Sequence, residues 1–227
     1  MALLVAFEGI DGSGKGTQAK LLADRLEREG IAHALISFPR YEATLFGRAV
    51  GDFLNGRYGA LDEVDPHLVS LLYAGDRFES RELLLDAMAA NEVVVLDRYV
   101  PSNIAHQGAK VPADERRAFI DWVSRIEYDI FRLPRADLVI LLDVPVEVAR
   151  KQIAMKQSRT YTDKPADLQE ADAAYLEAVR EVYLEVSAAA GDWRRVECVR
   201  ESSVRTIDDI AIEIWNVIQS RRPGGDA

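Results

Sequence analysis

The sequence lacks several features that would point to particular classes of protein. Its 227 residues contain a single cysteine, Cys198, so no intrachain disulfide can form and a reducing, cytoplasmic setting is expected. No apolar run approaches the ~20 residues that are needed to span a bilayer, so we expect no membrane segment. Residues 1–5 have no basic flank and are typical of a buried strand rather than of a signal peptide.

Internal repeats and low-complexity linkers are absent too, and the length fits one large domain. We therefore expect a single domain over residues 1–221. Residues 222–227 combine proline, glycine and aspartate, and they predict a disordered tail.

Positive charge is scarce. The chain has 28 Lys and Arg residues against 38 Asp and Glu, which gives a formal net charge of −10 at pH 7. Proteins that bind nucleic acid usually carry a basic surplus, so we expect no nucleic-acid partner. A small anionic ligand is still compatible with this charge, because exposed charges are screened beyond about 8 Å at physiological salt. The cations that matter should then stand in local motifs.

The most informative feature present is a glycine-rich segment between an apolar run and a helical pattern. Residues 9–17 follow the apolar residues 3–7 and contain Lys15. A strand, a glycine loop and a helix in this order are the context of a phosphate-binding P-loop. Backbone N–H groups of such a loop and helix N-terminus surround a polyphosphate, and Lys15 adds a positive charge. The alternative is a glycine turn that binds no phosphate. The predicted phosphate-binding residues are Gly9, Ile10, Asp11, Gly12, Ser13, Gly14, Lys15, Gly16 and Thr17.

One position in this loop departs from the usual pattern. Gly16 stands where Ser or Thr is common, and the hydroxyl of that residue normally helps to hold Mg²⁺. Thr17 follows one place later. We therefore expect Mg²⁺ to depend on phosphate oxygens, water and a carboxylate elsewhere, for which Asp97 is the candidate.

Further apolar runs predict four more strands, at residues 33–37, 93–97, 138–143 and 195–199. Continuous β-branched runs suit strands that are buried on both faces of a parallel sheet. Helical patterns lie between them, at residues 17–29, 66–90, 112–131, 145–155, 170–190 and 203–221. The alternation predicts an α/β P-loop NTPase fold, a three-layer sandwich with about five parallel strands and helices on both faces. Ligands bind at the carboxyl ends of such strands, where the strongest motifs stand.

Charged residues stand at the ends of two of these strands. Asp97 ends a buried strand and is placed to orient Mg²⁺ and its waters, or else to cap the next turn. Arg98 offers a planar fork that matches a phosphate. Asp143 also ends a strand, but Pro145 follows it, which favours a role at a helix entry over metal binding.

Two weaker groups could contribute to a nucleotide site. The segment Phe38, Pro39 and Arg40 combines an aromatic ring with a cation. Tyr73 and Arg77 are four residues apart on a predicted helix and so share a face. The alternative is that Tyr73 is part of the core and that Arg77 pairs with a nearby acid.

Polar side chains after residue 99 form a third group. Asn103 and Gln107 carry amides that could read the edge of a base, together with Ser102. A helix-capping role for Ser102 competes with this reading. We place His106 on the surface or behind the site, because no second metal-ligating residue lies near it in the sequence at the spacing that a metal site requires.

A polar segment, residues 156–168, joins two predicted helices without an apolar face of its own. It carries the cations Lys156, Arg159 and Lys164. The segment is either a solvated connection or a lid that closes over a phosphoryl-transfer site and excludes water.

Taken together and in order, these motifs resemble the thymidylate kinase family of nucleoside monophosphate kinases. The matching segments are residues 7–15, 38–41, 76–77, 97–103, 133–137 and 167–170. The resemblance implies an enzyme that transfers the γ-phosphoryl of ATP to dTMP, giving dTDP and ADP in dTTP synthesis, with Mg²⁺ as cofactor. Two alternatives stay open: a kinase of another nucleoside monophosphate or deoxynucleoside, and a non-catalytic nucleotide-binding switch. The Asn-Lys-x-Asp motif of a GTPase-type switch does not occur.

The resemblance also implies roles for the cations. Lys15 would cradle the donor phosphates, and Arg150 would lie against the donor adenine. Arg40, Arg77 and Arg98 would hold the acceptor phosphate. Catalysis would rest on these residues and Asp97, since phosphoryl transfer needs positioning and charge neutralisation.

On the acceptor side, the resemblance gives Asp11 a contact with the 3′-hydroxyl of the sugar. Phe38 would stack on thymine, and Tyr99 would crowd the sugar and disfavour a 2′-hydroxyl. Asn103 and Gln107 would line the base pocket.

The resemblance bears on the lid and on assembly as well. Residues 9–14 contain no cation, so the second catalytic cation is expected from the lid, with Arg159 first and Lys164 second. Family members are often homodimers that pair through long helices, and the patterns at 66–90 and 112–131 are the candidates here.

Overall fold

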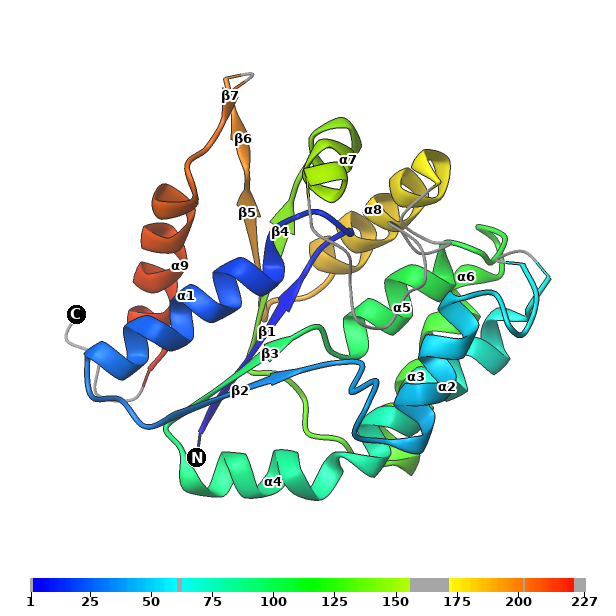
Figure 1. The fold of residues 1–227 in the computed structure, drawn as a ribbon, viewed down its shortest axis with the longest axis horizontal. Coiled ribbons are helices and arrows are strands. Elements are labelled where there is room, and N and C mark those ends of the chain that lie inside the picture. Colours follow the sequence, from blue (N-terminus) through cyan, green and yellow to red (C-terminus); the bar gives the residue numbers. More distant parts are fainter. Residues whose placement is uncertain (1, 61–62, 156–171, 202, 223–227) are drawn as a thin grey trace.

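The computed structural model describes residues 2–60, 63–155, 172–201 and 203–222. At its centre is a five-stranded sheet in the order β2-β3-β1-β4-β5, and every neighbouring pair is parallel (Figure 1). The predicted α/β fold with about five parallel strands is confirmed. The strands are β1 (Leu3–Glu8), β2 (His33–Ser37), β3 (Val93–Asp97), β4 (Leu138–Asp143) and β5 (Trp193–Glu197).

The three central strands are buried on both faces, as their apolar runs predict. Every residue of β1 and β4 is buried, whereas β2 and β5 lie at the edges and each buries a single residue. Successive side chains of β1 point to opposite faces. Leu3, Val5 and Phe7 accordingly join one core cluster, and Leu4 and Ala6 join another.

Helices cover both faces of the sheet (Figure 1). The cluster that contains Phe7 is closed by α1 (Lys15–Arg28), α7 (Val146–Met155), α8 (Ala173–Ala188) and α9 (Ile207–Arg221). The cluster that contains Leu4 is closed by α4 (Arg81–Ala90), α5 (Val100–Gly108) and α6 (Arg116–Ser124). None of the helices among the described residues is long and apolar enough to cross a membrane.

Two of the predicted helices are each divided. The pattern at 66–90 is split into α3 (Pro66–Glu79) and α4 by Ser80, whose buried hydroxyl accepts a hydrogen bond from Arg40 Nη1 at 3.1 Å. The pattern at 112–131 contains α6 followed by one π-helical segment, η1 (Arg125–Ile130). A π-bulge of this kind often marks a functional site.

Some elements were missed by the sequence patterns. Helix α2 (Leu45–Leu54) contains two glycines, and α5 buries all nine of its residues, so it has no polar face to give a helical period. A short antiparallel pair, β6 (Val199–Arg200) and β7 (Ser203–Val204), precedes α9. Strand β7 takes the first two residues of the last predicted helix, and α9 begins only at Ile207.

The carboxyl ends of the strands meet at one edge, as expected. Arg98 N donates to Phe7 O at 3.1 Å, and Phe38 N donates to Asp97 O at 3.0 Å. The ends of β1, β2 and β3 are thereby fixed side by side. The predicted lid, residues 156–168, lies outside the described residues, as does most of the predicted tail.

Candidate active site

The glycine loop after β1 is shaped by close backbone approaches. Gly9 has φ 141°, and a Cβ there would lie 2.6 Å from Leu142 O of β4. Gly12 has φ 80°, and a Cβ there would lie 2.3 Å from Ala149 O of α7. Neither position admits a side chain, because both contacts are with backbone atoms. The loop is therefore held between β4 and α7, and Arg150 of α7 follows directly on the contact at Ala149.

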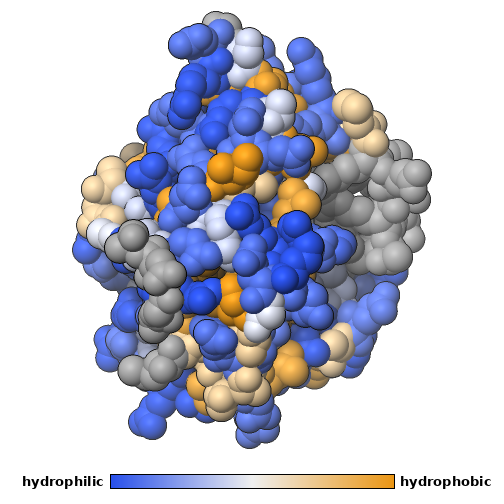
Figure 2. Space-filling view, turned by 90° about the vertical axis from the view of Figure 1, so that its left-hand side faces the viewer, coloured by the Kyte–Doolittle hydropathy of each residue, from blue (hydrophilic) through white to orange (hydrophobic). Residues whose placement is uncertain are grey.

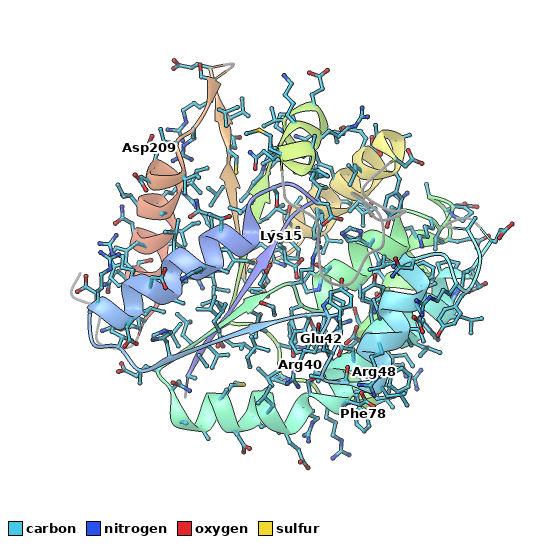
Figure 3. All side chains as sticks on the ribbon, viewed as in Figure 1. Lys15, Arg40, Glu42, Arg48, Phe78 and Asp209 are labelled. Atoms are coloured by element: carbon cyan, nitrogen blue, oxygen red, sulfur yellow. The ribbon has the colours of Figure 1, made fainter. Side chains whose placement is uncertain are left out.

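Lys15 is the first residue of α1 and is 6 % exposed (Figure 3). Its Nζ donates to Ile10 O at 3.0 Å and lies 3.8 Å from Asp11 Oδ1. The ammonium therefore lies against the loop, at the positive end of the α1 dipole. Backbone N–H groups, a helix N-terminus and a cation at one place make an anion-binding arrangement.

The absence of a side chain at Gly16 has a structural reason. A Cβ at Gly16 would lie 2.9 Å from Asp97 Oδ2, which is closer than ordinary van der Waals contact. The Asp97 carboxylate thus lies against the first turn of α1. It is half-buried.

Arg98 and Asp11 are brought together as an ion pair between Arg98 Nη2 and Asp11 Oδ1. Arg98 has φ 68°, in the left-handed region that side chains other than glycine rarely adopt, at a cost of roughly 1–2 kcal/mol. This backbone conformation turns the guanidinium back towards the loop. The structure therefore supports a shared site for these two predicted residues, and their contacts with a substrate stay predictions.

Glu8 was missed as a site residue. It is fully buried at the end of β1 and accepts hydrogen bonds from Tyr99 N at 2.7 Å, Ser102 Oγ at 2.6 Å and Tyr183 OH at 2.8 Å. Burial raises the pKa of Glu8, although the hydrogen bonds and Arg98 act in the opposite direction. An acid inside an apolar strand is the signal that would have identified it. The capping alternative for Ser102 is wrong, since its hydroxyl donates to Glu8 and makes no cap hydrogen bond.

His106 is not on the surface, contrary to one of the two predicted placements. It is 6 % exposed. The hydroxyl of Tyr175 donates its hydrogen to the backbone oxygen of His106, and the same hydroxyl oxygen lies 3.1 Å from His106 Nδ1. Nδ1–H therefore donates to Tyr175, and Nε2 is left to accept from Arg98 Nη1 at 3.4 Å. Burial lowers the pKa of His106 to about 3, so the ring is neutral at pH 7.

This shift predicts a specific loss of stability in acid. Below the ordinary pKa of 6.5, the unfolded chain takes up a proton on His106 that the folded chain does not bind until about pH 3. Over that range the free energy of unfolding should fall by about 1.4 kcal/mol per pH unit from this residue. In urea unfolding at pH 7, 5 and 4, His106→Phe should lose that part of the pH dependence. His67→Gln, which replaces a half-exposed ring, is the control and should keep the pH dependence that comes from His106. Identical pH dependence in wild type and His106→Phe would disprove the lowered pKa of His106.

Arg77 forms an ion pair with an acid, which is the alternative to a phosphate contact that its sequence context allows. It is 2 % exposed, and its Nε and Nη2 donate to the two oxygens of Glu127, at 2.8 Å for Nε. Asn103 Nδ2 donates to the same carboxylate at 2.8 Å. Gln107 is fully buried, and neither of its amide atoms has a hydrogen-bond partner among the described residues. A phosphate contact of Arg77 stays a prediction, and it would have to compete with Glu127.

The predicted aromatic residues lie at different depths. Phe38 is 4 % exposed and packs near Tyr99, with ring centroids 6.2 Å apart, next to the cis peptide bond to Pro39. Tyr99 is fully buried and donates to Pro134 O at 2.7 Å. Tyr73 is half-buried. We still predict that Phe38 stacks on a base and that Tyr99 contacts a sugar. Because both rings are buried, each contact would require neighbouring side chains to move.

Other predicted residues lie nearer the surface or outside the described part. Arg40 is half-buried in the loop after β2 (Figure 3), and Arg150 is exposed on α7. Arg159 and Lys164 lie outside the described residues.

The role of Asp143 at the entry of α7 stays a prediction, and the structure shows a further role for this side chain. Its carboxylate accepts from Arg180 Nε at 2.7 Å and from Arg195 Nη2 at 2.6 Å. It thus ties β4 to α8 and β5 at the same edge of the sheet. Within the described ranges, no three His, Cys, Asp or Glu side chains gather into a metal cluster.

Comparison with known proteins identifies the family. The sequence pattern described as Thymidylate kinase matches residues 7–202. A probable thymidylate kinase of Thermococcus gammatolerans is 33 % identical over 224 residues, 96 % of this chain and 97 % of that protein. A thymidylate kinase of Mycobacterium tuberculosis is 31 % identical and covers 84 % of this chain and 89 % of its own. The fold matches a solved thymidylate kinase from Candida albicans with a TM-score of 0.75 at 23 % identity, over 96 % of this chain and 92 % of that one. The chain therefore belongs to the thymidylate kinase family.

Proposed function

We propose that this protein is a thymidylate kinase, which transfers the γ-phosphoryl of ATP to dTMP and gives dTDP and ADP for dTTP synthesis. The observation that carries the proposal is the convergence of the glycine loop, Lys15, Asp97 and the Arg98–Asp11 ion pair on one edge of the sheet. Phosphoryl transfer requires two anionic substrates to be aligned and their charge to be neutralised. A polyphosphate cradle beside a second cation meets both requirements.

On the donor side, loop amides, the α1 N-terminus and Lys15 would bind the β- and γ-phosphates of ATP. Arg150 lies on α7, which packs against the loop at Gly12. It is exposed and so is free to lie against the adenine that extends from the bound phosphates. These assignments make the loop the donor half of a two-substrate site.

We propose Asp97 as the protein carboxylate for Mg²⁺. Mg²⁺ usually keeps several waters and binds one or two carboxylates together with substrate phosphates, so a single carboxylate beside the loop fits. When bound, the ion would offset the negative charge of the transferring group. The approach of Asp97 to Gly16 holds this carboxylate at the start of α1.

Gly16→Ala tests this placement. The added Cβ would lie 2.9 Å from Asp97 Oδ2, so the carboxylate would have to move by a few tenths of an ångström. Because a misplacement of about 1 Å at a reacting centre costs on the order of 10²-fold, we expect kcat to fall several-fold and the Mg²⁺ concentration for half-maximal rate to rise. Gly51→Ala in α2, where the nearest atom lies 3.6 Å away, should leave both unchanged. Wild-type kcat and Mg²⁺ dependence in Gly16→Ala would contradict this placement of the Asp97 carboxylate.

On the acceptor side, we propose that Arg98 holds the phosphate of dTMP and that Asp11 accepts from the sugar 3′-hydroxyl. In the structure the two side chains pair with each other, so substrate would exchange this ion pair for two charge-assisted hydrogen bonds. Asn103 and Gln107 would face the base. Arg40 would supply a further cation from the loop after β2.

We propose residues 156–168 as the lid and Arg159, before Lys164, as the cation that it brings to the transferring phosphoryl. The support is the sequence alone: the loop provides Lys15 as its single cation, and the lid segment is rich in cations. A closing lid would exclude water and so favour transfer over hydrolysis.

We also propose a homodimer. Large apolar side chains are exposed on α3 and η1, where Leu68 is 61 %, Phe78 50 % and Ile130 57 % exposed. Phe78 and Phe131 have ring centroids 4.7 Å apart, so the end of α3 and the residue after η1 share an apolar contact. By contrast, hydrophilic side chains predominate on the face that Figure 2 shows. Light scattering coupled to gel filtration should give twice the 25.3 kDa of one chain, and a monomer would contradict the proposal.

An acceptor panel tests the substrate. ADP release should be measured with saturating ATP and each of dTMP, dUMP, dCMP, dGMP, AMP and thymidine. We expect the highest kcat/KM with dTMP and no turnover with thymidine, which lacks the phosphate. A preference for another nucleotide would identify a different member of the nucleoside monophosphate kinases.

A further inference from the structure

Glu8 stands at the end of β1 beside Arg98, and it has no part in the function proposed above. It is fully buried, and its two oxygens are shared among three donors. Oε1 accepts from Tyr99 N at 2.7 Å, and Oε2 accepts from Ser102 Oγ at 2.6 Å and from Tyr183 OH at 2.8 Å. The carboxylate therefore joins the peptide after Arg98, helix α5 and helix α8 at one point.

The first consequence concerns the backbone of Arg98, whose φ of 68° is unfavourable for a residue with a side chain. Both peptide N–H groups that flank this residue are hydrogen-bonded to the end of β1. Arg98 N donates to Phe7 O at 3.1 Å, and Tyr99 N donates to the Glu8 carboxylate. A strained conformation of this kind persists only where its surroundings fix it. Glu8 therefore supplies one of the two hydrogen bonds that hold the left-handed turn.

The second consequence concerns the hydroxyl of Ser102. The hydrogen bonds to Glu8 and the charge of Arg98 favour the ionised carboxylate, which can only accept. Ser102 therefore donates its single hydrogen to Glu8 Oε2, and the lone pairs of its oxygen are left to accept. Arg98 Nη1 donates to this oxygen at 3.4 Å, while Arg98 Nη2 pairs with Asp11. Glu8 thus sets an acceptor against one edge of the guanidinium.

The third consequence concerns helix α8, which reaches Arg98 by two routes. Tyr183 is 1 % exposed, and its hydroxyl donates to Glu8 Oε2. Tyr175 lies two turns earlier on the same helix, and its hydroxyl contacts His106 Nδ1 at 3.1 Å. His106 Nε2 lies 3.4 Å from Arg98 Nη1. Helix α8 therefore supports Arg98 through two different side chains.

We propose that Glu8 is a positioning residue for the acceptor phosphate, an inference that rests on the proposed function. It holds Arg98 in its left-handed conformation and, together with Tyr183, orients the Ser102 hydroxyl towards the guanidinium. Glu8 acts through Arg98 and does not touch the substrate in this role. Charge alone leads to the opposite expectation, because a buried acid near a phosphate repels it and its removal should strengthen the binding of dTMP.

Glu8→Gln separates these two expectations. The glutamine keeps one oxygen for Tyr99 N but presents an N–H₂ group to Ser102 and Tyr183, whose hydroxyls then have to turn. We expect kcat/KM for dTMP to fall by about 10- to 100-fold, because a misplacement of about 1 Å costs on the order of 10²-fold. The KM for dTMP should rise, and the KM for ATP should stay unchanged. An unchanged or lower KM for dTMP would overturn the proposal.

A double-mutant cycle with Arg98→Gly shows whether Glu8 acts through Arg98. Glycine adopts the φ of 68° without strain and has no guanidinium, so nothing is left for Glu8 to position. Adding Glu8→Gln to Arg98→Gly should therefore change kcat/KM for dTMP by less than about twofold. A further fall equal to that in the wild-type background would indicate a general structural role and would overturn the proposal.

Tyr183→Phe keeps the test decisive if Glu8→Gln does not fold. It keeps the buried ring and removes one donor to Glu8. We expect kcat/KM for dTMP to fall by about 5- to 10-fold, the effect of one hydrogen bond, and this fall should vanish in the Arg98→Gly background. Wild-type kcat/KM in Tyr183→Phe, or an equal fall in the Arg98→Gly background, would count against the proposal in the same way.

Two matched controls complete the experiment. Asp137→Asn also changes a carboxylate to an amide at β1, because Asp137 Oδ2 accepts from Leu4 N at 2.8 Å, but at the opposite end of the strand. Tyr128→Phe removes the hydroxyl of a half-buried tyrosine that makes none of the hydrogen bonds described above. Both variants should retain wild-type kcat/KM for dTMP, and losses equal to those of Glu8→Gln and Tyr183→Phe would overturn the proposal. A wild-type enzyme without dTMP-dependent release of ADP would instead overturn the proposed function, so the two failures are distinguishable.

Discussion

Replacing Lys15 by alanine should lower kcat for dTMP phosphorylation by about 10³-fold or more, the range seen when one phosphate-stabilising cation is removed in related chemistry. The reason is electrostatic. Lys15 is the single cation of the loop, its ammonium lies 3.0 Å from Ile10 O, and the α1 N-terminus adds only a partial charge. Without it, the developing charge between donor and acceptor would be offset by Mg²⁺ and the lid alone.

Lys20→Ala provides the control for this prediction. Lys20 lies on the same helix but is exposed and pairs with Asp24 at 2.8 Å, so its loss should leave kcat unchanged. Both variants should keep a cooperative thermal transition, which shows that Lys15→Ala is folded. Rates within tenfold of each other in the two variants would mean that Lys15 has no special role in transfer.

Replacing Arg98 by glycine should lower kcat/KM for dTMP by a similar order, about 10³-fold. Glycine adopts φ 68° without strain, so the backbone that joins β3 to α5 should be preserved. What is lost is the guanidinium that pairs with Asp11 in the structure and that we assign to the acceptor phosphate. The fall in kcat/KM for dTMP should be much larger than any change in KM for ATP.

Arg132→Gly is the matched control, because Arg132 is also a left-handed arginine, with φ 54°, and is exposed. The two variants share the change in side chain and in backbone freedom. Arg132→Gly should therefore retain wild-type kcat/KM. If the two variants lose activity equally, the effect comes from the backbone and Arg98 is not an acceptor ligand.

The fold was predictable because its signals are local. Residues 93–96 and 138–142 are apolar throughout, and they form strands that are buried on both faces. The glycine loop was equally clear, since its spacing and its lysine depend on neighbouring residues. Helix α5 was missed because it is buried all round, and a helix without a polar side gives no amphipathic period.

The polar networks around the site were not predictable, since their members are far apart in sequence. Glu8 is bonded to Ser102 and Tyr183, which are 94 and 175 residues away. Glu127 looked like an ordinary charged residue of a surface helix until the π-helical turn brought it to Arg77. Side-chain type and spacing show which groups are available for chemistry, but the partner of each group is set by tertiary packing.

The most direct test of the account follows the phosphoryl group itself. ATP with radioactive phosphorus at the γ position should be incubated with dTMP, Mg²⁺ and the wild-type protein, and the labelled products should be separated. The account predicts label in dTDP, in amounts equal to the ADP formed, and almost none in a parallel reaction with Lys15→Ala. Label that appears only as inorganic phosphate, or dTDP formed equally well by Lys15→Ala, would contradict it.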